Sequence, residues 1–230
     1  MNATMEEVSR KLKLTEDEAN LVVLGEADTR STASDVGLCL LGRIFTKRVI
    51  DTEVLKATLI LVWCLSQGVN ITVLGENLFL FQFVHLVDKS KVLSYGPWSF
   101  DKHLLFCEFD PSLKPSKISF TYASFWIYVY NLPLISMTKS VGMVIANTIG
   151  SFIDMDYGDG GTTWENFLRI QVWLNVSRPL QRCMLIALQE RDPGWVSFKY
   201  ERLPNFCYYY RMLGHDDKEC HDRLMVRGGL

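Results

Sequence analysis

The 230-residue chain has room for one large domain or two small ones, and its 48% apolar and 22% charged residues are typical of a globular protein. This composition excludes a mostly disordered chain, a collagen-like repeat and a disulfide-dense scaffold. The net charge of −2 lacks the basic excess of a dedicated nucleic-acid binder, so charge alone does not predict tight binding of DNA or RNA.

The first 34 residues form an acidic segment, with seven acidic residues against four basic ones. Thr15-Glu16-Asp17-Glu18 has the pattern of a capping box, which predicts that residues 1–34 are partly helical. Met1–Arg10 lacks the apolar stretch of a secretory signal. We therefore expect an intracellular protein, in the nucleus or the cytoplasm, that is not secreted.

Residues 35–110 have the pattern of a complete α+β domain. Apolar periodicity and turn residues predict the order strand, helix, strand, strand, helix, strand. We expect these elements at residues 38–45, 51–63, 69–74, 78–83, 87–95 and 99–109. Two helices on an antiparallel four-stranded sheet in this βαββαβ order make the ferredoxin-like arrangement, which RNA-recognition motifs also use.

The longest apolar run of the chain lies in the first predicted helix. It covers Leu59–Leu65, far short of the roughly 20 residues that span a bilayer. We therefore expect no membrane partner.

A second, β-rich α+β half is predicted at residues 120–200, after a connector at 110–119 that contains Pro111 and Pro115. We expect a helix at residues 138–149 and strands at 125–130, 151–157, 167–176, 184–189 and 195–200. No second helix is predicted here, so this half is not a complete copy of the first.

Two aromatic patterns allow more than one interpretation. Ile127–Leu132 fits the strand of RNA-recognition motifs whose aromatic residue stacks on a base, but an ordinary sheet strand has the same pattern. The glycine of the companion motif is absent from Asn166–Ile170. Phe79, Phe81 and Phe83 share one strand face and form either core or an aromatic platform.

Acidic residues cluster between residues 154 and 165. Asp154, Asp156 and Glu165 fall at positions one, three and twelve of a calcium loop, but Asp159 stands where that loop needs glycine. A solvated acidic turn is the simpler interpretation. A metal-dependent nuclease that uses Asp154 and Asp156 is the alternative.

The six cysteines fall into two groups. Four stand singly among apolar residues and are expected to be buried as small hydrophobes: Cys39, Cys64, Cys107 and Cys183. Cys207 and Cys220 instead lie in a polar, aromatic tail with His215 between them.

Residues 201–222 match the spacing C-x₂-C-x₄-H-x₄-C of a zinc knuckle at three ligand positions, Cys207, His215 and Cys220. Gly214 supplies the glycine that lets the chain turn back before the histidine. Tyr210 occupies the second cysteine position and is a poor zinc ligand, because a phenol with a pKa of about 10 must first lose its proton. We expect zinc to bind weakly or not at all.

Five segments carry a resemblance to a known family: Leu41–Arg43, Gly75–Phe83, Gly96–Asp101, Asn131–Leu134 and Phe198–Pro204. Over residues 5–221 the chain resembles plant proteins that join a retrotransposon-associated domain of unknown function to a C-terminal zinc knuckle. These proteins look like products of the first open reading frame of LINE-type retrotransposons, or host copies of it. The resemblance implies binding of nucleic acid, above all single-stranded RNA, and zinc in the knuckle.

The leading hypothesis is a non-enzymatic, nucleic-acid-binding protein of retrotransposon origin. Around the knuckle, Arg202 and Arg211 are candidates for phosphate contacts, and Tyr208 and Tyr209 are candidates for stacking on bases. The alternative is a protein-interaction or relic domain without affinity for nucleic acid, which the acidic balance and the replaced ligand at Tyr210 favour.

Overall fold

The computed structural model describes residues 36–46, 48–108, 117–118, 120–156, 166–187, 192–215 and 220. The chain divides into two compact units, Met1–Gly37 and Leu38–Leu230, and every helix and strand given below belongs to the second unit. The predicted helical segment 1–34, with its capping box, lies outside the described residues. Most of the predicted connector 110–119 also lies outside them.

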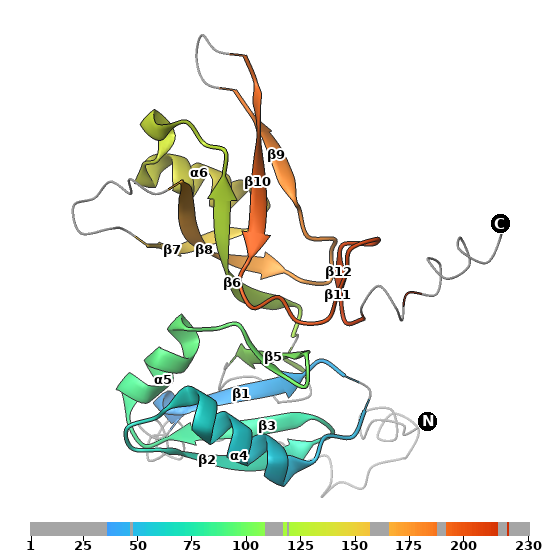
Figure 1. Ribbon diagram of the computed structural model, residues 1–230. Coiled ribbons are helices and arrows are strands. Elements are labelled where there is room, and N and C mark those ends of the chain that lie inside the picture. Colours follow the sequence, from blue (N-terminus) through green and yellow to red (C-terminus); the bar gives the residue numbers. More distant parts are fainter. Residues whose placement is uncertain are drawn as a thin grey trace, which may run out of the picture. The chain divides into compact units, whose positions relative to one another are not determined.

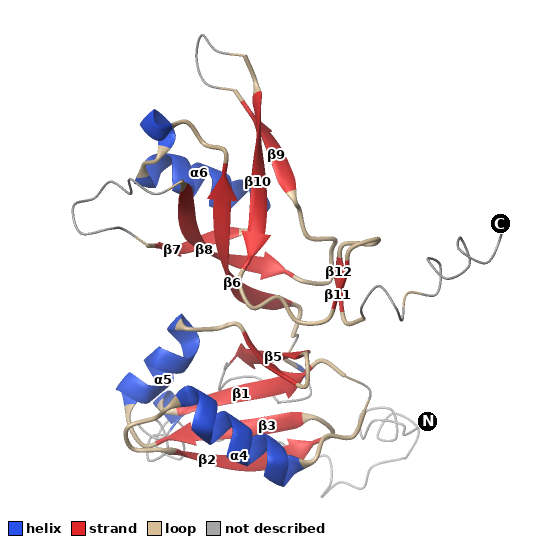
Figure 2. Ribbon diagram, viewed as in Figure 1, coloured by secondary structure: helices blue, strands red, loops and turns tan. Residues whose placement is uncertain are grey.

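The predicted α+β class is confirmed: the described residues form three α-helices and antiparallel sheets (Figure 1 and Figure 2). The first sheet contains β1 (Cys39–Ile44), β2 (Val69–Gly75), β3 (Leu78–Phe83), β4 (Trp98–Phe100) and β5 (His103–Glu108), with α4 (Thr52–Trp63) and α5 (Leu86–Ser94) between its strands. Its strand order is β2-β3-β1-β5-β4, and every neighbouring pair is antiparallel.

Helix α4 begins where the sequence predicts. The carboxylate of Asp51 accepts hydrogen bonds from the backbone N–H groups of Glu53 and Val54, at 3.0 and 3.2 Å, so it satisfies donors that have no partner within the helix. The helix buries Leu55, Leu59 and Trp63 against the sheet.

The phenylalanine stripe of β3 is core. Phe79, Phe81 and Phe83 are at most 2% exposed, and Trp63 meets Phe81 edge to face at 5.1 Å between ring centroids. The interpretation as an aromatic platform for bases is therefore wrong, because the helices cover this face of the sheet. Val92 of α5 belongs to the same cluster.

The single strand predicted at residues 99–109 is two strands, β4 and β5, which pair antiparallel with Trp98 opposite Leu105. Asp101 and Lys102 join them, and both have positive φ angles, 45° and 61°. Two consecutive left-handed residues suit a tight hairpin turn. The sequence lacks the Asn-Gly or Asp-Gly pair that is typical of such a turn. The division of the predicted strand into β4 and β5 was therefore not predictable from turn residues.

The second sheet has the strand order β7-β8-β6-β10-β9. Its strands are β6 (Tyr122–Tyr130), β7 (Ser151–Met155), β8 (Phe167–Asn175), β9 (Cys183–Ile186) and β10 (Gly194–Tyr200), and α6 (Lys139–Ile149) lies between β6 and β7, after a short 3₁₀ turn at Leu134–Ser136. This order is that of the first sheet with β6 to β10 in place of β1 to β5. Helix α5 has no counterpart, because residues 176–182 between β8 and β9 are described and form no helix.

Strand β6 alternates as an ordinary sheet strand does. Ile127 and Val129 are fully buried in the core under α6, whereas Tyr128 and Tyr130 are half-buried on the opposite face, beside Phe167 of β8. The expected strand is confirmed, and the aromatic side chains lie on the face away from the helix.

Two of the four cysteines expected to be buried are exposed. Cys39 is buried and Cys107 is half-buried, where burial raises the pKa of its thiol to about 12. Cys64 ends α4 in a left-handed conformation, and Cys183 lies on β9 at the edge of the second sheet. Apolar neighbours in the sequence do not predict burial at a helix end or at a sheet edge. None of the described helices is long and apolar enough to cross a membrane.

Candidate metal centre

A short hairpin after β10 builds the candidate site. Strands β11 (Phe206–Cys207) and β12 (Met212–Leu213) pair through Phe206–Leu213 and Cys207–Met212. The backbone N–H of Arg211 donates to the carbonyl of Cys207 at 2.7 Å and closes the turn. Arg211 and Gly214 both adopt positive φ angles, 62° and 103°, so the chain reverses just before His215.

The predicted ligands come together. One ligand atom each of Cys207, His215 and Cys220 lies within 4.8 Å of the others. Zinc with sulfur ligands at about 2.3 Å places tetrahedral ligand atoms about 3.8 Å apart, so the three groups are close enough to serve one ion. Cys207 and Cys220 are at most 1% exposed. No other group of this kind occurs in the part of the chain that the structure describes.

The donor types fit zinc, although the ligand set has three members. Two thiolates and an imidazole are ligands that zinc prefers. The backbone nitrogen of Tyr210 lies 3.5 Å from Cys207 Sγ, and its N–H donates a hydrogen bond to the sulfur. The Tyr210 side chain is 39% exposed and packs edge to face on Tyr209 at 5.1 Å. The place of the second cysteine is therefore occupied by a surface aromatic residue.

Gly214 is required for two reasons. Its φ of 103° is unfavourable for residues with a side chain, and an added Cβ would lie 2.9 Å from Cε1 of Phe45. Phe45 follows β1, so the ligand hairpin packs closely against the end of the first sheet.

The hairpin is also anchored in the core of the second half. Phe206 and Leu213 are each 7% exposed and belong to the cluster that contains Leu180 and the buried residues of β6 and β8. The backbone N–H of Leu180 donates to the carbonyl of Arg211 at 2.8 Å. The residues predicted as a separate small module thus pack as part of the second half.

The residues predicted to contact nucleic acid surround this hairpin. Tyr208 and Tyr209 are 63% and 54% exposed, and Arg211 is exposed beside them. Arg202 donates from Nη1 to the carbonyl of Tyr95 at 2.6 Å, and its guanidinium carbon lies 5.1 Å from the centroid of the Trp98 ring.

Arg202 and Tyr208 line one groove of about 700 Å³, which we call the Trp98 groove. Trp98 and Lys102 also line it, and sequence reasoning missed both. The backbone N–H of Asn205 donates to the carbonyl of Lys102 at 2.8 Å and fixes the lead-in to the hairpin there. A signal for Trp98 existed in the Gly96–Asp101 segment, but nothing in the sequence paired that segment with the tail.

The aspartates of the acidic cluster have structural partners. Asp156 accepts from Nη1 of Arg169 at 3.0 Å, and Asp154 accepts from the backbone N–H of Met155 at 2.8 Å. Arg169 also donates to both carboxylate oxygens of Glu201, at 2.6 and 3.1 Å, which lowers the pKa of Glu201. Residues 157–165, with Glu165, lie outside the described residues. Among the described ones, neither aspartate belongs to a group of three metal-ligand side chains.

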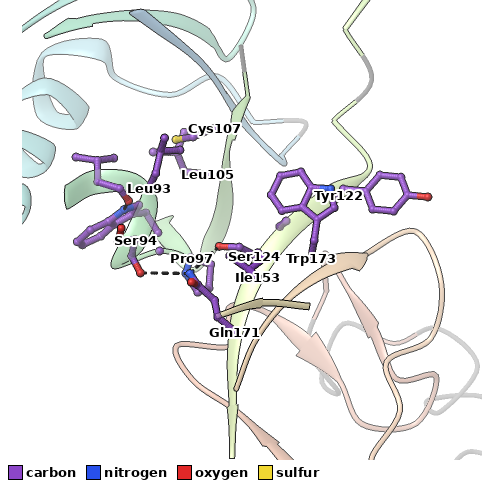
Figure 3. A pocket seen from close by; sticks show the side chains of 14 residues that line it. Leu93, Ser94, Pro97, Leu105, Cys107, Tyr122, Ser124, Ile153, Gln171 and Trp173 are labelled. Atoms are coloured by element: carbon purple, nitrogen blue, oxygen red, sulfur yellow. Dashed lines mark hydrogen bonds between the residues drawn. The ribbon is translucent and has the colours of Figure 1, made fainter. Parts of the chain in front are cut away.

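A cavity of about 230 Å³ lies between the two sheets and is mostly apolar (Figure 3). One of its polar lining residues, Gln171, is 4% exposed, and its side-chain amide donates to the carbonyl of Ser94 at 3.3 Å. The Trp126 ring N–H donates to the same carbonyl at 3.1 Å. Because Gln171 is already partnered, we interpret this cavity as a packing feature of the interface between the sheets.

Comparison with known proteins agrees with this arrangement. Residues 32–115 match a domain of unknown function (DUF4283), and residues 174–222 match the zinc knuckle family. The chain is 23% identical over 100 residues to the uncharacterized protein At4g02000 of Arabidopsis thaliana, a match that covers 44% of this chain and 32% of that protein. The chain thus spans about a third of this relative's length. The matches lie in the predicted order, with the similarity to a domain of unknown function before the similarity to a zinc knuckle.

Proposed function

We propose that the protein binds single-stranded nucleic acid, with RNA as the preferred ligand, through a zinc-loaded knuckle and the surface around it. The observation that carries the proposal is the convergence of Cys207, His215 and Cys220 within 4.8 Å, next to the exposed rings of Tyr208 and Tyr209. Zinc would hold the turn in one conformation. The exposed rings would then be ready to stack on bases.

The chemistry of the surrounding residues supports this function. Stacking of a base on an aromatic side chain is worth about 1–3 kcal/mol and tolerates any sequence. Arg211 and Lys102 add positive charge near the rings, and Arg202 presents a guanidinium over Trp98. A net charge of −2 leaves little long-range attraction for phosphates. Local stacking and local charge therefore supply the affinity.

The scaffold is compatible with the same task. The first sheet has the strand order β2-β3-β1-β5-β4, with α4 and α5 between its strands. We propose that it is the ferredoxin-like arrangement with β4 added at the edge. The resemblance to products of LINE-type retrotransposons motivates two further parts of the proposal: the protein is a retrotransposon-derived, non-enzymatic component, and it acts in the nucleus or the cytoplasm.

A titration of the full chain with fluorescently labelled oligouridylate tests the proposal. The zinc-loaded protein should bind at 50 mM salt with an affinity that falls as salt rises, because phosphate contacts release counterions. Cys207→Ser should weaken binding and zinc retention, whereas Cys183→Ser, at an exposed cysteine outside the knuckle, should change neither. Absence of binding by the zinc-loaded wild type at 50 mM salt would contradict the proposal.

The outer face of α4 favours protein binding as a second candidate function. Val54, Leu61 and Val62 are 53%, 76% and 50% exposed, an unusual apolar content for a solvent-facing helix surface. Wild-type protein that fails to bind oligouridylate, while Leu61→Glu changes its sedimentation behaviour, would favour this second function.

A further inference from the structure

A second groove, of about 870 Å³, borders the knuckle. We call it the Arg43 groove. The end of β1 and the residues after it form one wall of the groove. The start of β5 and the residues Ile118, Phe120 and Thr121 contribute other walls, and Leu213–His215 of the knuckle complete the groove. His215 is thus both a predicted metal ligand and a lining residue of this groove.

The formal charges in the Arg43 groove have one sign. They come from Arg43 and Arg48, and none of the groove's described lining residues is acidic. Both arginines are exposed. In a chain with a net charge of −2, a groove with this lining is a local positive site. Arginine forms strong charge-assisted hydrogen bonds with phosphate oxygens, so the lining suits a phosphodiester backbone.

Aromatic rings lie beside these charges. Phe45 is 50% exposed and stands next to Gly214, at the boundary between the groove and the knuckle. The guanidinium carbon of Arg43 lies 6.0 Å from the centroid of the Phe120 ring. An exposed ring next to arginines is the combination by which proteins hold single strands, with bases on the ring and phosphates on the cations.

One polar atom of the groove residues lacks a partner. His103 Nδ1 is buried and makes no hydrogen bond within the described part of the chain. Buried polar atoms without partners are rare in native proteins, and each calls for an explanation. This nitrogen belongs to a residue that lines the Arg43 groove, but because it is buried it is not presented to a ligand in the groove.

We infer that the Arg43 groove binds the phosphodiester backbone of the same single strand that contacts the knuckle. The inference rests on the proposed function and adds a surface to it. The strand would pass from Tyr208 and Tyr209 across the knuckle to Phe45, with phosphates on Arg43 and Arg48. Two phosphate contacts would then come from residues that lie far from the knuckle in the sequence.

The double variant Arg43→Gln/Arg48→Gln of the full chain tests the inference by titration with oligouridylate and with oligothymidylate between 50 and 200 mM salt. Loss of two phosphate contacts should reduce the slope of log affinity against log salt by about 1.4 and weaken binding by about tenfold at low salt. Lys56→Gln/Arg182→Gln changes the net charge equally outside the groove and should keep the wild-type slope. Arg43→Lys/Arg48→Lys retains both charges and should keep most of it.

The outcomes separate the two proposals. If the Gln variant binds both oligonucleotides like its charge-matched control, the inference fails and the proposed function stands. No binding by the wild type overturns both. Competition by polyglutamate as effective as that by oligouridylate would overturn the inference in favour of an acidic protein ligand. If the slope of log affinity against log salt is reduced in the Gln variant with both oligonucleotides, the result supports a contact with the backbone. If the slope is reduced with oligouridylate alone, the result supports a backbone contact that prefers ribose.

Discussion

The two five-stranded sheets share one strand order but differ in how their apolar faces are covered. The first sheet has two helices, and its core cluster consists of residues between Leu40 and Cys107. The second has only α6, and its cluster includes Leu180, Phe206 and Leu213 from the chain around the knuckle. An apolar sheet face must be covered by another element. The knuckle hairpin therefore contributes to a core that lacks a second helix.

This difference connects metal binding with the fold. Phe206 and Leu213 flank the candidate ligand Cys207 and the turn that follows it, so an ion that orders the turn would also order two residues of the second core. We expect zinc to stabilise the second half and to leave the first half nearly unchanged.

The largest effect is expected for Tyr210→Cys. Outer-sphere partners of a metal typically contribute about 10–100-fold to affinity, so a restored thiolate ligand should raise zinc affinity by more than about a hundredfold. Competition with a chromophoric chelator measures this. Tyr210→Ser, which removes the phenol without adding a thiolate, should stay close to the wild type. Hydrogen exchange with zinc should slow in β8 and β10 more than in β1 and β3. Unchanged affinity in the Cys variant would show that residue 210 cannot reach the ion.

Leu213→Ala should have the next largest effect. Removal of a buried leucine side chain costs about 2–5 kcal/mol of unfolding free energy, and the loss should appear as faster exchange in the second sheet. Leu61→Ala, at a position 76% exposed on α4, is the control and should cost little. A Leu213 variant as stable as this control would mean that the knuckle is an independent module and does not contribute to the core of the second sheet.

Glu201→Gln should cost about 1–2 kcal/mol, because it removes the charge-assisted pair with Arg169 on the open face of the second sheet. The side chains of Arg169 and Glu201 are only 25% and 18% exposed. The exposed pair of Glu53 and Lys56 on α4 serves as the control, and Glu53→Gln should cost well under 1 kcal/mol. Urea denaturation measures both. Equal losses of unfolding free energy in Glu201→Gln and Glu53→Gln would show that the two ion pairs contribute equally to stability, which would contradict this prediction.

The smallest effect is the loss of stability at low pH that follows protonation of Asp88. Asp88 of α5 is buried and accepts the backbone N–H groups of Ser66 and Gln67, both at 3.0 Å, which lowers its pKa below the ordinary value of 3.8. The resulting stability is fully present above pH 3.8 and is lost as pH falls through the lowered pKa. The difference in unfolding free energy between the wild type and Asp88→Asn should therefore shrink from pH 6 to pH 3. A difference independent of pH would contradict the assignment.

Much of the local structure was predictable from sequence patterns. Helix α4 starts after Asp51 as predicted, because an N-cap aspartate and the periodic burial of Leu55 and Leu59 are local signals. Strand β3 has the predicted bounds for a similar reason: alternating phenylalanines mark one buried face. The three candidate ligand residues were predictable from the spacing of Cys207, His215 and Cys220 in the sequence.

Other features do not follow from these local patterns. The division of one predicted strand into β4 and β5 comes from a hairpin without the usual turn residues, and the exposure of Cys64 comes from its place at the end of α4. The contact of Arg202 with Trp98 depends on residues that meet from distant positions. The same holds for the Arg43 groove, where β1 and the knuckle are separated by more than 160 residues of chain. The helices, most strands and the spacing of the candidate ligands were predictable from local patterns, because caps and periodicity act over a few residues. Long-range packing decides which face of each sheet is covered and which element covers it, and local patterns do not predict such packing.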